Sequence, residues 1–84
     1  FAVITRDSEH KSLVHCYSKN MKKLFTVPSN KLCFDILINS SSGVLTAVYY
    51  DVGDGQGSTF IDVRKISDPY TSTQYEIKGE KNDN

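Results

Sequence analysis

Several features of large or membrane-spanning proteins are missing from this chain of 84 residues. It has no tryptophan, a single methionine and no apolar run near the roughly 20 residues that a bilayer-crossing helix needs. Net charge is missing too: ten Lys and Arg balance ten Asp and Glu, so no field draws nucleic acid or an anionic membrane. These absences predict one small domain, residues 1–84, that binds neither of those partners.

Motifs for catalysis or cofactor binding are also absent. No serine stands in a GxSxG elbow, and no Cys and His residues have the spacing of metal ligands. The glycine-rich stretch 53–57 is neither GxGxxG nor a Walker A motif, and it precedes a strand rather than a helix. His10 in a polar turn and His15 in an apolar run favour structural roles over catalysis. We expect neither an enzyme nor a cofactor.

The chain does contain short runs of β-branched and aromatic residues between turn-forming residues. No stretch of ten or more residues carries the 3.6-residue apolar period of an amphipathic helix. Seven strands are expected, at residues 1–5, 13–17, 24–27, 31–38, 44–51, 59–66 and 74–78. The continuously apolar run 31–38 favours a central strand, and the last strand is expected to turn Tyr75 and Ile77 inward. The pattern predicts an all-β fold, a small antiparallel β-sandwich of about seven to eight strands.

A hairpin predicted between residues 43 and 69 organises the chain. Its strands, 44–51 and 59–66, are joined by a loop whose glycines can reach positive φ without steric cost. The second strand alternates Ile61 and Val63 with charged residues, the period-2 pattern of a half-buried strand. Pro69 is expected to end this strand, because proline cannot donate to a sheet ladder.

The loop of this hairpin holds the candidate site residues. Asp51, Asp54, Gln56 and Ser58 are expected to form a partner-binding loop, because loops on a rigid sheet often carry recognition. A Ca²⁺ site on Asp51, Asp54 and Asp62 is disfavoured, since the closing glutamate of an EF-hand is missing. A sandwich of this size fills its interior with its own side chains. Partners are therefore expected on loops, a sheet face or an unpaired edge, with micromolar affinity.

Two covalent modifications are expected. Cys16 and Cys33 lie in separate apolar runs outside any CxxC or Cys/His cluster, which favours a disulfide, with two buried free thiols as the alternative. A disulfide would stabilise the domain by roughly 3 kcal/mol and would indicate an oxidising compartment. Asn39-Ser40-Ser41 is an N-glycosylation sequon in an expected turn, so Asn39 is a candidate glycosylation site.

Several motifs together resemble the GOLD domain of the p24 (transmembrane emp24 domain) family of cargo receptors. They are Leu24-Phe25-Thr26-Val27-Pro28, Cys33-Phe34, the glycine-rich loop 53–57, Ile61-Asp62-Val63, Asp68-Pro69 and Tyr75. The family's Cys-Phe-Ser-Asn element comes late in the domain, whereas the similar Cys16-Tyr17-Ser18-Lys19-Asn20 comes early here. The resemblance therefore implies that the two parts of the domain are in circularly permuted order. Residues 1–5 would then pair beside a strand that follows Leu24, and Phe1 would lie close to Asn84.

The resemblance also implies a topology and a function. The implied topology is a jelly-roll-like sandwich in which Cys16 pairs with Cys33. The implied function is that of a lumenal module that recognises secretory cargo, or that binds other p24 GOLD domains in a homo- or hetero-oligomer. The module would work in the endoplasmic reticulum, the ER–Golgi intermediate compartment or the Golgi. The parent protein would be a single-pass membrane protein, and membrane attachment would come only through its parts that are absent from this chain. A start at Phe1 suggests that the chain is a processed or excised fragment. The alternative is a small secreted, disulfide-stapled effector or toxin-like β-protein, supported by size and cysteine count alone.

Overall fold

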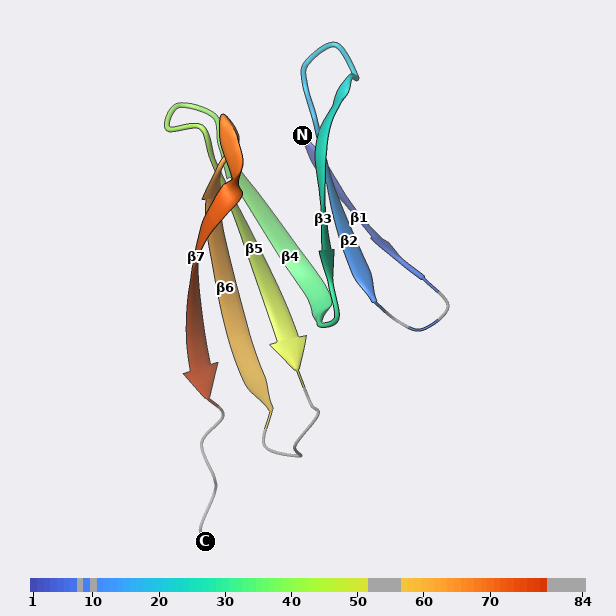
Figure 1. Ribbon diagram of the computed structural model, residues 1–84, viewed down its shortest axis with the longest axis vertical. Helices are drawn as coiled ribbons and strands as arrows, with labels where there is room; N and C mark the ends of the chain where they lie inside the picture. Colours follow the sequence, from blue (N-terminus) through green and yellow to red (C-terminus); the bar gives the residue numbers. More distant parts are fainter. Residues whose placement is uncertain (8, 10, 52–56, 79–84) are drawn as a thin grey trace, which may run out of the picture.

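The computed structural model describes residues 1–7, 9, 11–51 and 57–78, which form seven β-strands in two antiparallel sheets (Figure 1). The strands are β1 (Ala2–Arg6), β2 (Ser12–Tyr17), β3 (Lys23–Ser29), β4 (Leu32–Asn39), β5 (Val44–Asp51), β6 (Ser58–Lys65) and β7 (Asp68–Lys78). The first sheet has the order β1-β2-β3 and the second the order β4-β5-β6-β7. The all-β prediction is confirmed, and each of the seven expected strands has a counterpart.

Three expectations about strand order are wrong. β1 pairs with β2, with Val3 opposite His15, so residues 1–5 do not pair with a strand that follows Leu24. β4 is an edge strand rather than a central one. The described strands form two consecutive meanders instead of a jelly roll: within each sheet every strand pairs with the next one in sequence, and the connection from β3 to β4 crosses between the sheets. Asn84, and with it the expected closeness to Phe1, lies outside the described residues.

The last strand begins six residues earlier than expected, at Asp68 instead of Gln74. Pro69 lies inside β7 and does not end β6. The pairing of β6 with β7 shifts here, with Arg64 opposite Ser72 but Lys65 opposite Asp68. Proline is tolerated at this place because the ladder is irregular there and β7 is the edge strand of its sheet.

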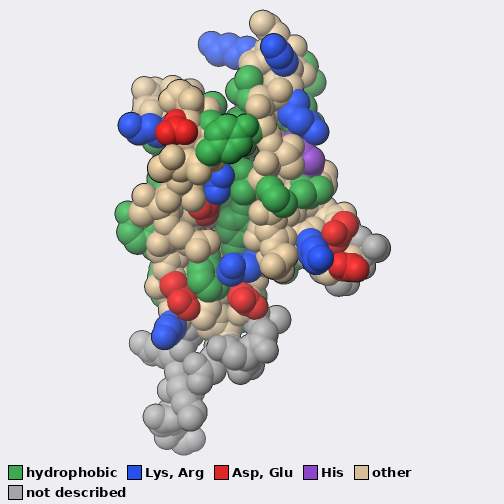
Figure 2. Space-filling model, viewed as in Figure 1, with side chains coloured by type: hydrophobic (Ala, Val, Ile, Leu, Met, Phe, Trp, Pro, Cys, Tyr) green, Lys and Arg blue, Asp and Glu red, His purple; other side chains and the backbone are tan. Residues whose placement is uncertain are grey.

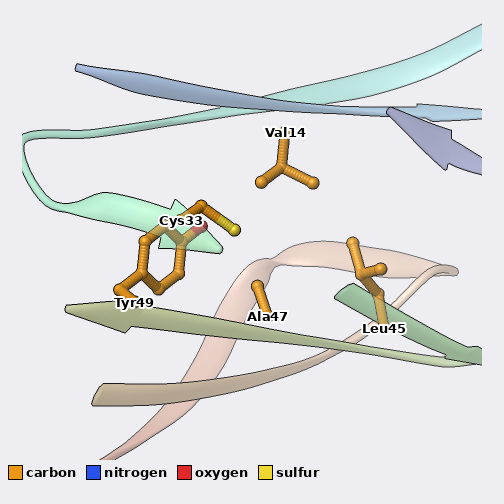
Figure 3. Packing of buried hydrophobic residues seen from close by; sticks show 5 residues of the cluster. All are labelled: Val14, Cys33, Leu45, Ala47 and Tyr49. Carbon is orange, nitrogen blue, oxygen red and sulfur yellow. The ribbon is translucent and has the colours of Figure 1, made fainter. Parts of the chain in front are cut away.

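The core lies between the two sheets. Val14 of the first sheet packs with Cys33, Leu45, Ala47 and Tyr49 of the second, and each of these residues is at most 3% exposed (Figure 3). Half-buried apolar residues surround this cluster, namely Ala2, Ile4, Phe25, Val27, Ile36, Ile38, Phe60 and Ile66. In the view of Figure 2, hydrophobic side chains run down the middle of the molecule and most charged ones lie at its periphery. The coarse prediction of a β-sandwich is therefore confirmed.

The expected disulfide is wrong, because Cys16 and Cys33 are both free and buried. The backbone N–H of Cys33 donates to Ser12 Oγ at 2.7 Å, which places Cys33 beside the start of β2. Cys16 lies four residues further along β2 than Ser12, about 13 Å from Ser12 at the rise of a strand, whereas a disulfide needs the two cysteine Cα atoms within about 7 Å of each other. Burial raises the pKa of both thiols, so both stay protonated at neutral pH.

Candidate protein-interaction surface

The register of the second sheet points the charged side of β6 into the sandwich. Leu45 pairs with Arg64 and Ala47 pairs with Asp62. Directly opposed residues of an antiparallel pair share one face of the sheet, and Leu45 and Ala47 belong to the core. Asp62 and Arg64 therefore point inward, and Asp62 is 5% exposed. The apolar residues that alternate with them, such as Ile61, face outward.

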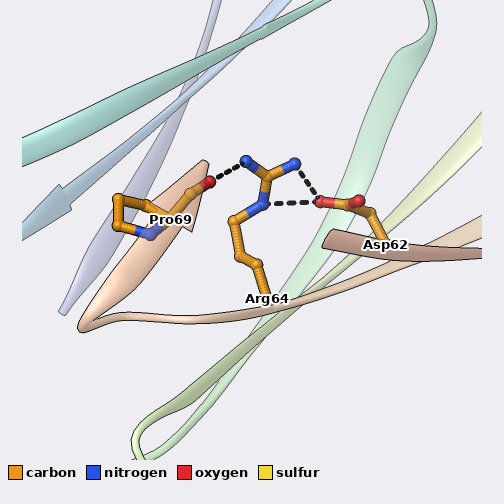
Figure 4. Close-up of polar contacts among 3 residues, drawn as sticks. All are labelled: Asp62, Arg64 and Pro69. Carbon is orange, nitrogen blue, oxygen red and sulfur yellow. Dashed lines mark hydrogen bonds and ion pairs between the residues drawn. The ribbon is translucent and has the colours of Figure 1, made fainter. Parts of the chain in front are cut away.

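Asp62 is held inside by an ion pair with Arg64 (Figure 4). The guanidinium donates from Nε and Nη2 to Asp62 Oδ2 at 2.8 and 2.6 Å, and from Nη1 to the carbonyl oxygen of Pro69 at 2.7 Å. A buried carboxylate without a partner is costly, so this pairing is what permits the inward placement. The bond to Pro69 also ties the start of β7 to β6. Asp54, which the Ca²⁺ alternative also needs, lies outside the described residues.

The outward side of the second sheet, named the outer face below, is apolar and exposed. The strand register places on it Leu32, Leu37, Thr46, Val48, Tyr50, Thr59, Ile61, Val63, Thr73, Tyr75 and Ile77. Leu37, Tyr75 and Ile77 are 69%, 56% and 57% exposed, so none of the described segments covers them. Among the described residues of this side Asp35, Lys65 and Asp68 carry charge, the first on edge strand β4 and the other two opposite each other beside the β6–β7 turn.

The expectation that Tyr75 and Ile77 point inward is wrong. Tyr75 pairs with Ile61 and Ile77 pairs with Thr59, and both partners lie on the outer face. The direction of β7 side chains follows from β6, whose own direction is fixed by pairing with the core strand β5. A shift of one residue in the pairing of β6 with β5 would turn every side chain of β6 to the opposite face of the sheet. The pairing register therefore decides which side of β6 and β7 faces the core.

A hollow of about 300 Å³ lies at the end of the outer face near the β6–β7 turn. It is lined in part by Val44, Val63, Lys65 and Thr73. A hollow of this kind in a flat sheet can receive one side chain of a partner.

Of the predicted partner-binding loop, the structure describes only the base. Asp51 and Ser58 are opposite each other where β5 and β6 meet the loop, while Asp54 and Gln56 lie outside the described residues. Gly57 has a φ of 72°, and a Cβ there would lie 2.5 Å from the Tyr50 hydroxyl. Glycine is therefore required at this position, and Tyr50 lies at the junction of the loop and the outer face.

Asn39, the candidate glycosylation site, is the last residue of β4 and is exposed. Its Oδ1 accepts hydrogen bonds from Ser41 Oγ at 2.8 Å and from the N–H of Ser42 at 3.2 Å. The two residues that define the sequon are thus in contact at the surface. Asn39 stands two positions after Leu37, so it lies on the side of the outer face, at its turn end.

His15 is tied into the first sheet. Its Nε2 lies 2.8 Å from Thr5 Oγ1 and its Nδ1 lies 3.1 Å from Thr26 Oγ1, which links all three strands. Hydroxyl groups can donate or accept, so they satisfy both ring nitrogens. This arrangement explains His15 as a cross-strand structural residue, while His10 lies outside the described residues.

Sequence reasoning missed the outer face, although one signal for it was available. The run 32–38 is apolar on both sides of the strand, and a two-layer sandwich can cover only one of them. Within the described ranges no three His, Cys, Asp or Glu side chains are grouped to hold a metal ion. The same part of the chain has no helix long and apolar enough to cross a membrane. Comparison of the chain with protein-family models, curated proteins and solved structures found no match.

Proposed function

We propose that this chain is a protein-binding module, a GOLD-like domain of a p24-like cargo receptor that recognises secretory cargo or other p24 proteins between endoplasmic reticulum and Golgi. The observation that carries the binding part of the proposal is the exposed, nearly uncharged outer face. Contiguous apolar patches larger than a few hundred Å² are rare on monomeric proteins and mark interaction sites. The family, and the permuted order of its parts, rest on the motif resemblance described above.

The chemistry of the outer face suits a protein partner. Tyr50 and Tyr75 offer large apolar rings with a hydroxyl at one end, and Leu37 and Ile77 add aliphatic area. Tyrosine is enriched at interfaces because it buries much area at low conformational cost and still forms hydrogen bonds. Few charges need to be stripped of water when such a face is covered.

The proposed compartment rests on fewer observations than the sequence suggested. Because Cys16 and Cys33 lie apart, no disulfide supports an oxidising compartment. The lumenal assignment therefore depends on the p24 resemblance and on the exposed sequon at Asn39. The gene of the parent protein tests it directly: a single membrane helix followed by a dilysine or diphenylalanine tail is expected. A stop codon soon after this domain would favour a secreted effector instead.

Binding is tested by titrating the isotopically labelled chain with unlabelled p24 GOLD domains and following its amide resonances. We expect shifts at outer-face residues of β4 to β7 and loss of binding in Leu37→Lys. The control is Met21→Lys, since Met21 is 70% exposed, as Leu37 is at 69%, but lies in the β2–β3 turn of the first sheet. No binding to any GOLD domain, or shifts confined to the first sheet, would contradict the proposal.

A further inference from the structure

We propose that one end of the molecule, named the basic tip below, docks on an anionic lipid surface. The basic tip consists of the β2–β3 turn, residues 18–22, with Lys23 and Leu24 after it and Phe1 beside it. The turn projects beyond the β4–β5 turn in Figure 1, at the end opposite to that where β7 ends. This inference is independent of the proposed function, because the basic tip belongs to the first sheet and the outer face to the second.

The charges of the molecule are unevenly distributed, although the formal net charge is zero at pH 7. The β2–β3, β4–β5 and β6–β7 turns meet at one end, since residues of all three line the same hollow. The charged residues of these turns and of the positions that flank them are Lys19, Lys22, Lys23, Lys65 and Asp68. The three lysines at the β2–β3 turn are exposed, and no ion pair links them to another described residue (Figure 2). A positive end attracts an anionic surface even where the whole chain is neutral.

Met21 adds an exposed apolar side chain to the basic tip. The residue is 70% exposed and has a φ of 64°, in the left-handed region that glycine and asparagine adopt most readily. Two hydrogen bonds fix the turn: the N–H of Met21 donates to the carbonyl oxygen of Ser18 at 3.1 Å, and the N–H of Ser18 donates to that of Lys22 at 2.9 Å. Neither the core nor the backbone conformation gains from an apolar side chain at this position. Insertion at the boundary of lipid headgroups and acyl chains would bury it.

A hollow of about 500 Å³ opens beside the β2–β3 turn and extends the apolar part of the basic tip. Phe1 and Leu24, 51% and 47% exposed, line it together with Lys19. The ring of Phe1 stacks on Tyr17 with the centroids 5.1 Å apart, which holds Phe1 at this end. Exposed apolar side chains among lysines are typical of segments that lie in a lipid interface. A nucleic acid or a sulfated glycan would pair with the lysines but would leave Met21 and Leu24 in water, so the composition favours a lipid surface.

The test is co-sedimentation of the chain with two kinds of vesicle, one of phosphatidylcholine alone and one that also holds about 30% phosphatidylserine. We expect binding to the anionic vesicles that falls as salt is added, and little binding to the neutral ones. Lys22→Gln combined with Lys23→Gln should weaken binding about 25-fold, because each lysine near an anionic surface contributes about fivefold. Met21→Asn should weaken binding about fivefold by removing the inserted side chain, and asparagine suits the positive φ of this position.

The matched control combines Lys11→Gln with Lys78→Gln. Both lysines are exposed and lie at the other end of the molecule, one just before β2 begins and one where β7 ends. This control has the same net charge as the Lys22→Gln, Lys23→Gln variant, and its binding should stay within about twofold of that of the parent chain. Circular dichroism checks that each variant keeps the strand signal of the parent chain.

Four outcomes would overturn the inference. Equal weakening by the two double variants would show that binding follows net charge and not the basic tip. Equal binding to neutral and anionic vesicles would remove the role of the lysines, and full binding by Met21→Asn would remove the role of insertion. Retention on a heparin column without binding to either vesicle would assign the lysines to a soluble polyanion. Titration with GOLD domains uses no lipid, so the failure of either experiment leaves the other conclusion standing.

Discussion

Replacing Arg64 by methionine should destabilise the fold more than other single changes on β6. Asp62 is 5% exposed, and the three hydrogen bonds that the Arg64 guanidinium donates go to Asp62 Oδ2 and to the carbonyl oxygen of Pro69. Methionine fills much of the same space but leaves the carboxylate buried without a partner. Breaking a buried pair in this way costs about 3–5 kcal/mol.

That cost is large for a domain of this size. A chain of 84 residues has a free energy of unfolding of about 4–12 kcal/mol at roughly 0.05–0.15 kcal/mol per residue. Asp62→Asn should cost less than Arg64→Met, because the amide keeps an acceptor for the guanidinium and no buried carboxylate is left. The double variant should be more stable than Arg64→Met alone, since it buries no unpaired charge. Lys65→Met is the matched control and should change stability by about 0.5 kcal/mol or less, because Lys65 is exposed.

Urea unfolding followed by circular dichroism measures these four variants against the parent chain. A loss below about 1 kcal/mol for Arg64→Met would show that Asp62 is in contact with water. The same conclusion would follow if the double variant had the same free energy of unfolding as Arg64→Met alone. Either result would refute the inward placement of the charged side of β6, and with it the outward placement of Ile61 on the outer face.

Three further predictions concern single residues. Burial raises the pKa of Tyr49 from 10.0 to about 12, and nearby Cys33 adds a smaller contribution. As the pH rises, Tyr49 therefore ionises in the unfolded chain before it ionises in the folded one. The free energy of unfolding should fall between pH 10 and 12 by at most about 2.7 kcal/mol. Tyr49→Phe should remove this loss and raise the free energy of unfolding at neutral pH by about 1 kcal/mol, because the hydroxyl is buried with no partner among the described residues. Urea unfolding at several pH values measures both effects, and a destabilised variant would contradict the prediction. Cys16 and Cys33 should resist alkylation until the chain unfolds and should show no mass change on reduction; rapid labelling of the native protein would contradict their burial. Expressed through the secretory pathway, the chain should carry a glycan at Asn39 that glycosidase removes and that Ser41→Ala abolishes; an unmodified mass in secreted protein would exclude the site.

Much of the secondary structure follows from local sequence. Val44–Asp51 was predicted with its observed bounds, because turn residues flank a continuous run of β-branched and aromatic side chains. The hairpin of β5 and β6 also follows, since two such runs joined by a glycine-rich loop pair most readily with each other. The exposed position of Asn39 next to a turn also follows from the sequence, since the turn-forming residues Ser40 to Gly43 come directly after it.

The candidate surface could not be predicted in the same way. Hydrophobic alternation in β6 and β7 shows that one side is apolar, and the natural expectation is that this side is buried. In the structure Tyr75 and Ile77 are exposed, because the pairing of β6 with β5 turns Asp62 toward the core. That pairing depends on contacts between strands, which the alternation within one strand does not encode.

The sequence by itself determined the number of strands, the hairpin of β5 and β6 and the lack of helix in the described part of the chain, because these depend on propensity and turn chemistry within a few residues. Only the tertiary structure decided which side of the second sheet is covered and whether Cys16 can reach Cys33. Both depend on how the two sheets align: the N–H of Cys33 bonds to Ser12 at one end of β2, and Cys16 lies at the other. Apolar surface can be covered by whichever sheet or partner lies nearest, since the hydrophobic effect has no direction of its own.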